Sequence, residues 1–173
     1  MNKRCLFHYY VEGQCEKKLL QTLKDKQLIV SGKIEVFNVT QDLFNATRLR
    51  LLPPNSVIVL VFDTDVKETD TLVQNICSLR KQTGIYDVFC IPQVRNLEDE
   101  IIRCTEIRTL KELLNCKSNS DFKQAFIAEK NLYEKLRSHY FDIQKLWSTE
   151  PAEEYRKQGI RNQSREIKIR KSK

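Results

Sequence analysis

The sequence predicts a compact α/β fold, in which a mostly parallel sheet is covered by helices on both faces. Strand-like apolar runs alternate with helix-like segments as far as residue 103, which is typical of parallel sheets with crossover helices. The run 56–62, SVIVLVF, is apolar on both faces, as a central and doubly covered strand must be. Breakers such as Gly13, Pro53 and Gly84 separate the segments.

The elements before the central strand follow from hydrophobic periodicity. Residues 5–11, CLFHYYV, are rich in aromatic residues and predict the first strand, which ends at Gly13. A leucine-rich helical pattern follows. Residues 33–40 alternate in polarity and predict a second strand, and a weaker helix is expected over 41–51.

The elements after the central strand are helical with one exception. Thr69 or Asp70 can cap a helix that ends at Gly84, and residues 86–92, YDVFCIP, predict the last strand. Asn96 then caps another helix. Three more helices are expected over 106–115, 120–129 and 130–138, so the C-terminal third is helical.

The composition favours a soluble globular protein. Of the 173 residues, 40% are hydrophobic and 31% are charged, and no apolar run approaches the roughly 20 residues that a bilayer requires. The apolar stretch 5–11 is too short for a signal peptide and is interrupted by Glu12. The six cysteines do not show zinc-site spacing, and we expect reduced thiols. These features predict a cytoplasmic protein without membrane association.

The net charge of +7 is concentrated near the C-terminal end of the chain. Residues 151–173 contain eight Lys and Arg against three Glu, which gives +5. We therefore divide the chain into an α/β domain with C-terminal helices, 1–147, and a basic tail, 148–173. A basic tail favours a polyanionic partner, most simply nucleic acid, although like-charged termini also occur as solvated segments.

Carboxylates follow three of the expected strands at their carboxyl ends. Glu12 follows the first strand, Asp63 and Asp65 follow the central strand, and Glu98 and Glu100 follow the last strand. Ligands of open α/β sheets bind beyond the carboxyl ends of the strands. Because residues two apart in an extended chain project to the same side, Asp63 and Asp65 predict a site for Mg²⁺, or for Mn²⁺ in its place.

Two of these segments resemble the motifs of Toprim domains, which have a Rossmann-like fold. Residues 10–16, YVEGQCE, resemble the hydrophobic-Glu-Gly-x-x-acid motif, and residues 61–65, VFDTD, resemble the Asp-x-Asp motif. Toprim domains occur in topoisomerases, bacterial primases and nucleases, and the resemblance covers residues 5–103. It implies that Glu12 is a metal ligand or general acid/base, and that Asp63 and Asp65 bind Mg²⁺.

The chain departs from the topoisomerase pattern. Lys67 stands where topoisomerase-type members often carry a further acid, and the chain has no room for strand-passage domains. The stretch 96–100 resembles the later acid cluster of small standalone Toprim nucleases of the overcoming-lysogenization-defect type, which often belong to phage defence. That resemblance implies that Glu98 or Glu100 completes the metal site, with Glu16 as a lesser second acid.

Each acidic motif also has an ordinary structural interpretation. Asp63 and Asp65 can form a turn after a strand, since Asp is favoured in turns. Glu98 and Asp99 lie in the first turn of an expected helix, where the helix dipole favours acids. Glu12 can belong to an ordinary strand-to-helix turn.

The sequence thus predicts a Mg²⁺-dependent nuclease for DNA or RNA with Glu12, Asp63 and Asp65 at its catalytic centre. The nucleic-acid backbone would be held by Lys67, Arg95, Arg161, Arg165, Lys168 and Arg170. One alternative is a non-catalytic subunit that binds a larger ATPase or ribonucleoprotein complex. Another is a phosphate-binding domain of the flavodoxin or receiver kind, although the chain has no glycine-rich phosphate loop.

Overall fold

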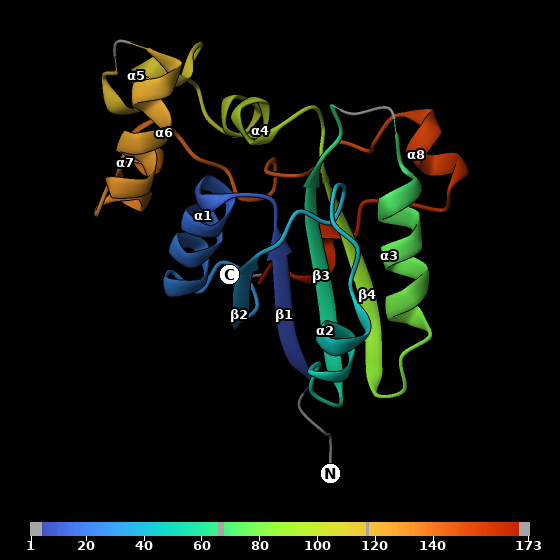
Figure 1. Cartoon of the computed structure of the whole chain (residues 1–173). Helices are drawn as coiled ribbons and strands as arrows, with labels where there is room; N and C mark the ends of the chain where they lie inside the picture. Colours follow the sequence, from blue (N-terminus) through green and yellow to red (C-terminus); the bar gives the residue numbers. More distant parts are fainter. Residues whose placement is uncertain (1–4, 66–67, 117, 170–173) are drawn as a thin grey trace.

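The fold is built on a four-stranded, all-parallel sheet with the strand order β2-β1-β3-β4 (Figure 1). The computed structural model describes residues 5–65, 68–116 and 118–169. The strands are β1 (Leu6–Val11), β2 (Gly32–Val36), β3 (Ser56–Asp63) and β4 (Ile85–Gln93). The predicted α/β class, with a parallel sheet covered on both faces, is confirmed.

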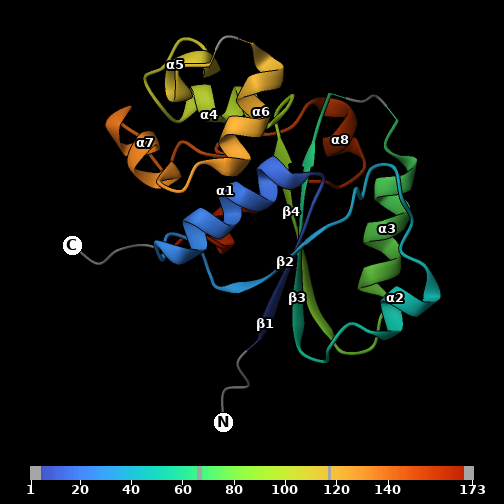
Figure 2. The same cartoon turned by 60° about the vertical axis from the view of Figure 1, so that its left-hand side comes forward.

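Helices cover the two faces of the sheet unequally (Figure 2). The α-helices within the described residues are α1 (Gln14–Asp25), α2 (Ala46–Arg50), α3 (Asp70–Arg80), α4 (Leu97–Arg103), α5 (Leu110–Leu114), α6 (Asn119–Ala128), α7 (Leu132–Ser138) and α8 (Glu153–Lys157). Helix α1 covers one face, and α6 and α7 pack against it. Helix α3 covers the other face beside α8. None of the described helices is long and apolar enough to cross a membrane.

Strand β3 is central because its side chains are apolar on both faces. Odd positions join the core under α1 and even positions join the core under α3: Val57, Val59 and Val61 in the first, Ile58, Leu60 and Phe62 in the second. All six side chains are buried. Since burying one such side chain stabilises the fold by about 1.5–3 kcal/mol, this strand anchors the sheet and sets the position of Asp63 at its end.

The strand order places a crevice at the carboxyl ends of β1 and β3. The connection after β1 leads outward to β2 on one side, and the connection after β3 leads outward to β4 on the other. Such a reversal is the topological switch point at which open α/β sheets bind their ligands. Glu12 follows β1 and Asp63 ends β3, so both residues lie at this point.

The basic segment that was expected to be a tail from residue 148 is packed against the domain as far as Ile169. Ile160 and Ile167 are buried. Val30 N donates to Ile167 O (2.8 Å), and Ile169 N donates to Leu28 O (3.0 Å). Sequence patterning did not reveal this packing because the few apolar residues are widely spaced among charged ones.

The observed elements differ from the expected ones mainly at their ends. The second strand ends at Val36 instead of residue 40, because the Asn38 side chain accepts hydrogen bonds from Thr40 N (3.0 Å) and Gln41 N (3.2 Å) and forms a turn. The helix expected over 106–115 is confined to Leu110–Leu114. As expected, Asn96 caps helix α4. Its side chain accepts a hydrogen bond from Asp99 N (2.9 Å).

Candidate functional site

Glu12 connects the ends of the two central strands. Its Oε1 accepts hydrogen bonds from Asp63 N (3.2 Å) and from Thr40 Oγ1 (3.2 Å). Burial raises the pKa of Glu12 to about 7, against the lowering effect of these two hydrogen bonds. Of the three acids predicted from the motifs, Glu12, Asp63 and Asp65, the structure joins the first two through the bond from Asp63 N to the Glu12 carboxylate, and Asp65 lines the cleft beside them.

Asp63 carries a buried carboxylate oxygen without a compensating interaction. Its Oδ1 has no hydrogen-bond partner among the described residues. Burial, followed by repulsion from Glu12 and Glu16, raises the pKa of Asp63 to about 8. A buried, unpaired carboxylate is costly, and a bound cation would offset that cost.

Glu16 belongs to the same group of acids, although the resemblance implied only a lesser role for it. It lies in the first turn of α1 and is only 8% exposed. A Cβ atom at Gly13 would lie 2.9 Å from Glu16 Oε2, so glycine at that position allows the carboxylate to fold back over the turn. Burial, together with repulsion from Glu98, raises the pKa of Glu16.

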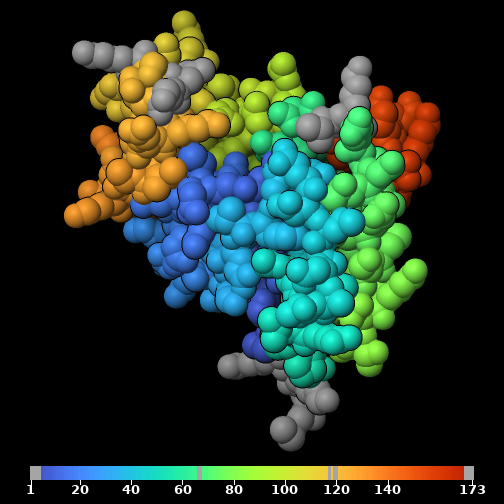
Figure 3. Space-filling model, in the orientation of Figure 1, coloured from blue at the N-terminus to red at the C-terminus, as the bar shows by residue number. Residues whose placement is uncertain are grey.

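A cleft of mixed charge opens beside Asp63. Its acidic side chains come from the sheet edge and α4, and its basic side chains come from the segment of α5 and α6: Asp63, Asp65, Glu98 and Asp99 in the first group, Arg108, Lys111 and Lys123 in the second. Lys123 Nζ lies 3.6 Å from Glu98 Oε1 and links the two groups. In Figure 3 helices α5–α7, coloured yellow to orange, form a lobe beside this edge.

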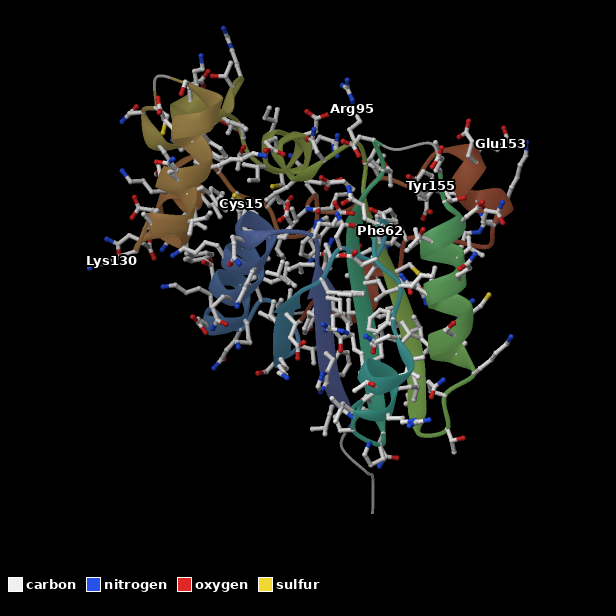
Figure 4. The ribbon with its side chains drawn as sticks, in the orientation of Figure 1. Cys15, Phe62, Arg95, Lys130, Glu153 and Tyr155 are labelled. Carbon is white, nitrogen blue, oxygen red and sulfur yellow. The ribbon has the colours of Figure 1, made fainter. Side chains whose placement is uncertain are left out.

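Thr64, between the two aspartates, fixes the rim of the cleft. Its N donates to Gln93 O (3.1 Å) and to Arg95 O (3.0 Å), while Arg95 N donates to Thr64 Oγ1 (3.0 Å). These bonds hold Arg95 at φ 71°, a strained region for a residue other than glycine. The Arg95 side chain extends from the upper edge (Figure 4) and lies 3.4 Å from Asp99 Oδ2 at its Nε.

The two later acids have different places in the structure. Glu98 lines the cleft, and its role in completing the metal site, which the resemblance to standalone nucleases implies, stays a prediction. Glu100 is fully buried and its oxygens are occupied: Oε1 accepts from Val94 N (2.9 Å) and Arg103 Nη2 (2.6 Å), and Oε2 accepts from Trp147 N (2.9 Å). Residues two apart on a helix face nearly opposite sides, so α4 cannot direct both carboxylates into one site. We therefore assign Glu100 a structural role and correct its expected metal role.

Three of the basic residues expected to hold nucleic acid, Arg161, Arg165 and Lys168, do not line this cleft. Lys67 and Arg170 lie outside the described residues. Arg161 and Arg165 are exposed, but neither lines the cleft. Lys168 is buried with its Nζ donating to Leu146 O and to Gln144 O (3.4 Å), and burial lowers its pKa. The expected contact from Lys168 is therefore corrected to a structural one.

The sequence interpretation missed three cationic side chains that line the cleft among the described residues. Arg108, Lys111 and Lys123 are interspersed with acids and apolar residues, so they do not form a conspicuous basic block. Within the described residues, no carboxylate pairs with the side chain of Arg108 or Lys111 within 4 Å. Their position near Asp63 depends on the packing of α6 against α1.

The oxygen ligands at the strand ends suit Mg²⁺, although they do not form a complete cage. In the part of the chain that the structure describes, no group of three or more His, Cys, Asp or Glu side chains is arranged to hold a metal ion. Mg²⁺ usually keeps several waters and needs only one or two carboxylates. Glu12 and Asp63 supply two carboxylates. Asp63 Oδ1, which has no hydrogen-bond partner among the described residues, is the oxygen that a bound cation would stabilise most.

Comparisons with protein-family models, curated proteins and solved structures find no match for this chain. The resemblance to Toprim domains therefore depends on the two short motifs around Glu12 and Asp63. The functional interpretation depends on the geometry and charge of the site that these residues form.

Proposed function

We propose that the protein is a Mg²⁺-dependent phosphodiesterase that cleaves nucleic acid, in the manner of a small Toprim nuclease. The observation that carries the proposal is the buried Asp63 Oδ1, which has no hydrogen-bond partner among the described residues and lies beside Glu12 at the topological switch point. A buried acceptor of this kind favours a cation. The resemblance to standalone Toprim nucleases extends the proposal to a role in phage defence.

Glu12 and Asp63 would hold the ion, and Asp65, Glu16 and Glu98 surround them. When bound, Mg²⁺ or Mn²⁺ would stabilise the charge on phosphate oxygens and lower the pKa of water. In the ion-free site burial raises the pKa of Glu12 to about 7; a bound cation would lower it, so Glu12 would hold the ion in its ionised form. Its hydrogen bond from Asp63 N orients the carboxylate toward the end of β3.

The cleft explains why a polyanion is the favoured substrate. Arg108, Lys111 and Lys123 lie where a phosphate backbone would pass beside the acids, and Arg95 extends from the rim. Cationic side chains of this kind supply most of the sequence-independent affinity for nucleic acid. We therefore propose that the cleft, and not the C-terminal segment expected from the sequence, binds the nucleic-acid backbone.

The strand order favours one second candidate, a phosphate-accepting domain of the receiver kind. The order β2-β1-β3-β4 is that of flavodoxin-like sheets, and Asp63 ends the strand next to the switch point. In that case Asp63 would accept a phosphoryl group from a small donor, and no nucleic acid would be cleaved. The two candidates differ in their product, which is cleaved nucleic acid for the first and phosphorylated Asp63 for the second.

The test is cleavage of labelled single- and double-stranded DNA and RNA with Mg²⁺ or Mn²⁺. Wild type, Asp63→Asn and a control, Asp87→Asn, are compared; Asp87 is exposed near the other end of β4. We expect cation-dependent cleavage that falls at least about 100-fold in Asp63→Asn and is kept in Asp87→Asn. Full activity of Asp63→Asn would overturn the assigned site. No cleavage of any substrate, together with phosphorylation of Asp63 by acetyl phosphate, would support the second candidate.

A further inference from the structure

Gln93 ends strand β4 directly beside Asp63. The two residues are Cα partners in the parallel register of β3 and β4. Partners on neighbouring strands point to the same face of a sheet, and the preceding pair on that face, Val61 and Ile91, belongs to the core under α1. The Gln93 carboxamide and the Asp63 carboxylate therefore project from adjacent strand ends toward the same face.

The Gln93 side chain is a buried polar group without partners. It is 0% exposed, and neither its Nε2 nor its Oε1 has a hydrogen-bond partner among the described residues. Asn75, the buried amide on the opposite face, shows the usual arrangement: it donates to Val39 O (2.8 Å) and Asp42 O (2.8 Å) and accepts from Phe44 N (2.8 Å). Gln93 thus departs from the rule, which Asn75 follows, that buried side-chain amides are hydrogen-bonded.

The backbone of Gln93, in contrast to its side chain, is held firmly. Thr64 N and Thr64 Oγ1 both donate to Gln93 O, each at 3.1 Å. Because Thr64 also separates the two aspartates, the same residue sets the positions of Asp63 and Gln93. Asp63 and Gln93 therefore stand on adjacent strand ends, and among the described residues they carry three buried polar atoms without a hydrogen-bond partner, Asp63 Oδ1 and both polar atoms of Gln93.

We propose that Gln93 is a positioning residue of the cation site, with its carboxamide sharing a buried polar niche with Asp63. A carboxamide offers an acceptor and two donors without a charge, so it can orient both a carboxylate and the hydration water of an ion. It adds this function without the repulsion that a further acid beside Glu12 and Glu16 would cause. The inference rests on the proposed function only in requiring that a divalent cation binds at Asp63.

The test measures Mn²⁺ binding to the full chain by titration calorimetry, together with the Tm of the cation-free protein. In Gln93→Leu we expect Mn²⁺ affinity to fall about 10- to 100-fold, as is typical when a residue supporting a metal ligand is removed. The Tm without cation should stay unchanged or rise, because an apolar side chain replaces buried polar atoms that have no partners. A purely structural Gln93 would give the opposite pattern, with a lower Tm and unchanged affinity.

Two further variants make the outcome decisive. Gln93→Met, with an adaptable side chain, replaces Gln93→Leu if the branched residue fails to pack. Asp63→Asn is expected to abolish Mn²⁺ binding. If it does so while both Gln93 variants bind Mn²⁺ as tightly as the wild type, the role of Gln93 is overturned and the cation site at Asp63 stands. Absence of saturable Mn²⁺ binding to the wild type overturns both the role of Gln93 and the cation site.

Discussion

Glu100, which is fully buried, and Asp63, whose Oδ1 is buried, both lie near the carboxyl edge of the sheet, and their carboxylates differ in their hydrogen bonds. Glu100 accepts three hydrogen bonds, from Val94 N, Trp147 N and Arg103 Nη2. Asp63 Oδ1 has no partner among the described residues. A carboxylate of the first kind joins segments of the chain together, whereas one of the second kind is stabilised only by something that binds to it.

The unpartnered atoms in the two regions also differ in kind. Near Glu100 they are donors, Arg103 Nε and Trp147 Nε1. At the strand ends they include a carboxylate acceptor, Asp63 Oδ1, whose neighbours Glu12 and Glu16 are also acids. Both regions contain buried polar atoms without partners among the described residues, so burial by itself does not show which acid belongs to a functional site. The difference lies in whether the carboxylate oxygens accept hydrogen bonds.

The largest expected effect is on folding. Glu100→Ala removes the acceptor of two buried backbone N–H groups and the partner of Arg103, and we expect it to lower the free energy of unfolding by about 3–5 kcal/mol. Asp63→Ala should cause no comparable loss. Urea unfolding of both variants at pH 7 measures the difference, and equal losses would contradict the contrast between the two acids.

The next effect concerns pH. The pKa values of Asp63 and Glu12 are about 8 and about 7 in the folded protein, above the ordinary values near 4. Between about pH 4 and pH 8 the unfolded chain has therefore lost protons that the folded one still holds, so stability should fall as pH rises. We expect a fall on the order of 1–3 kcal/mol, which is smaller in Asp63→Asn.

Unfolding of wild type and Asp63→Asn in urea at pH 5, 6, 7 and 8, without divalent cations, checks this effect. Asp87→Asn, which changes an exposed carboxylate near the other end of β4, is the matched comparison and should retain the pH dependence of the wild type. A stability that rises with pH over this range in the wild type would contradict the assigned burial of Asp63 and Glu12.

A smaller effect is expected from the cation. If Mg²⁺ binds with a Kd of about 1 mM, then 10 mM Mg²⁺ should stabilise the folded protein by about 1.4 kcal/mol at pH 8, and EDTA should reverse this. The effect should disappear at pH 5, where Asp63 and Glu12 hold their protons. Thermal unfolding would show the same response in Asp87→Asn and none in Asp63→Asn; a response kept by Asp63→Asn would place the ion elsewhere.

The smallest effect compares the cleft with the C-terminal segment. In an Asp63→Asn background, which prevents cleavage, Arg108→Gln/Lys111→Gln should weaken nucleic-acid binding about fivefold, which is just under 1 kcal/mol. The dependence of log affinity on log salt concentration should flatten by about 2. Fluorescence polarisation gives both quantities. A larger loss in Arg161→Gln/Arg165→Gln would return the binding role to the C-terminal segment.

The sequence by itself determined the fold class and the two main acids of the candidate site. The apolar run that became β3 and the breakers around it are local signals, and a strand that is apolar on both faces has one stable place, in the centre of a parallel sheet. Glu12 and Asp63 could be found because the first directly follows a strand and the second ends one, and parallel strands bring such positions together.

The tertiary structure decided which other residues belong to the site. Glu98 and Glu100 look equivalent in sequence, but the helix turns one toward the cleft and the other toward Trp147 N. Contacts between segments far apart in the chain likewise decide that the Gln93 side chain has no hydrogen-bond partner among the described residues and that Lys111 lines the cleft. Such contacts leave no local pattern, because hydrogen-bond satisfaction and charge convergence are properties of the packed molecule.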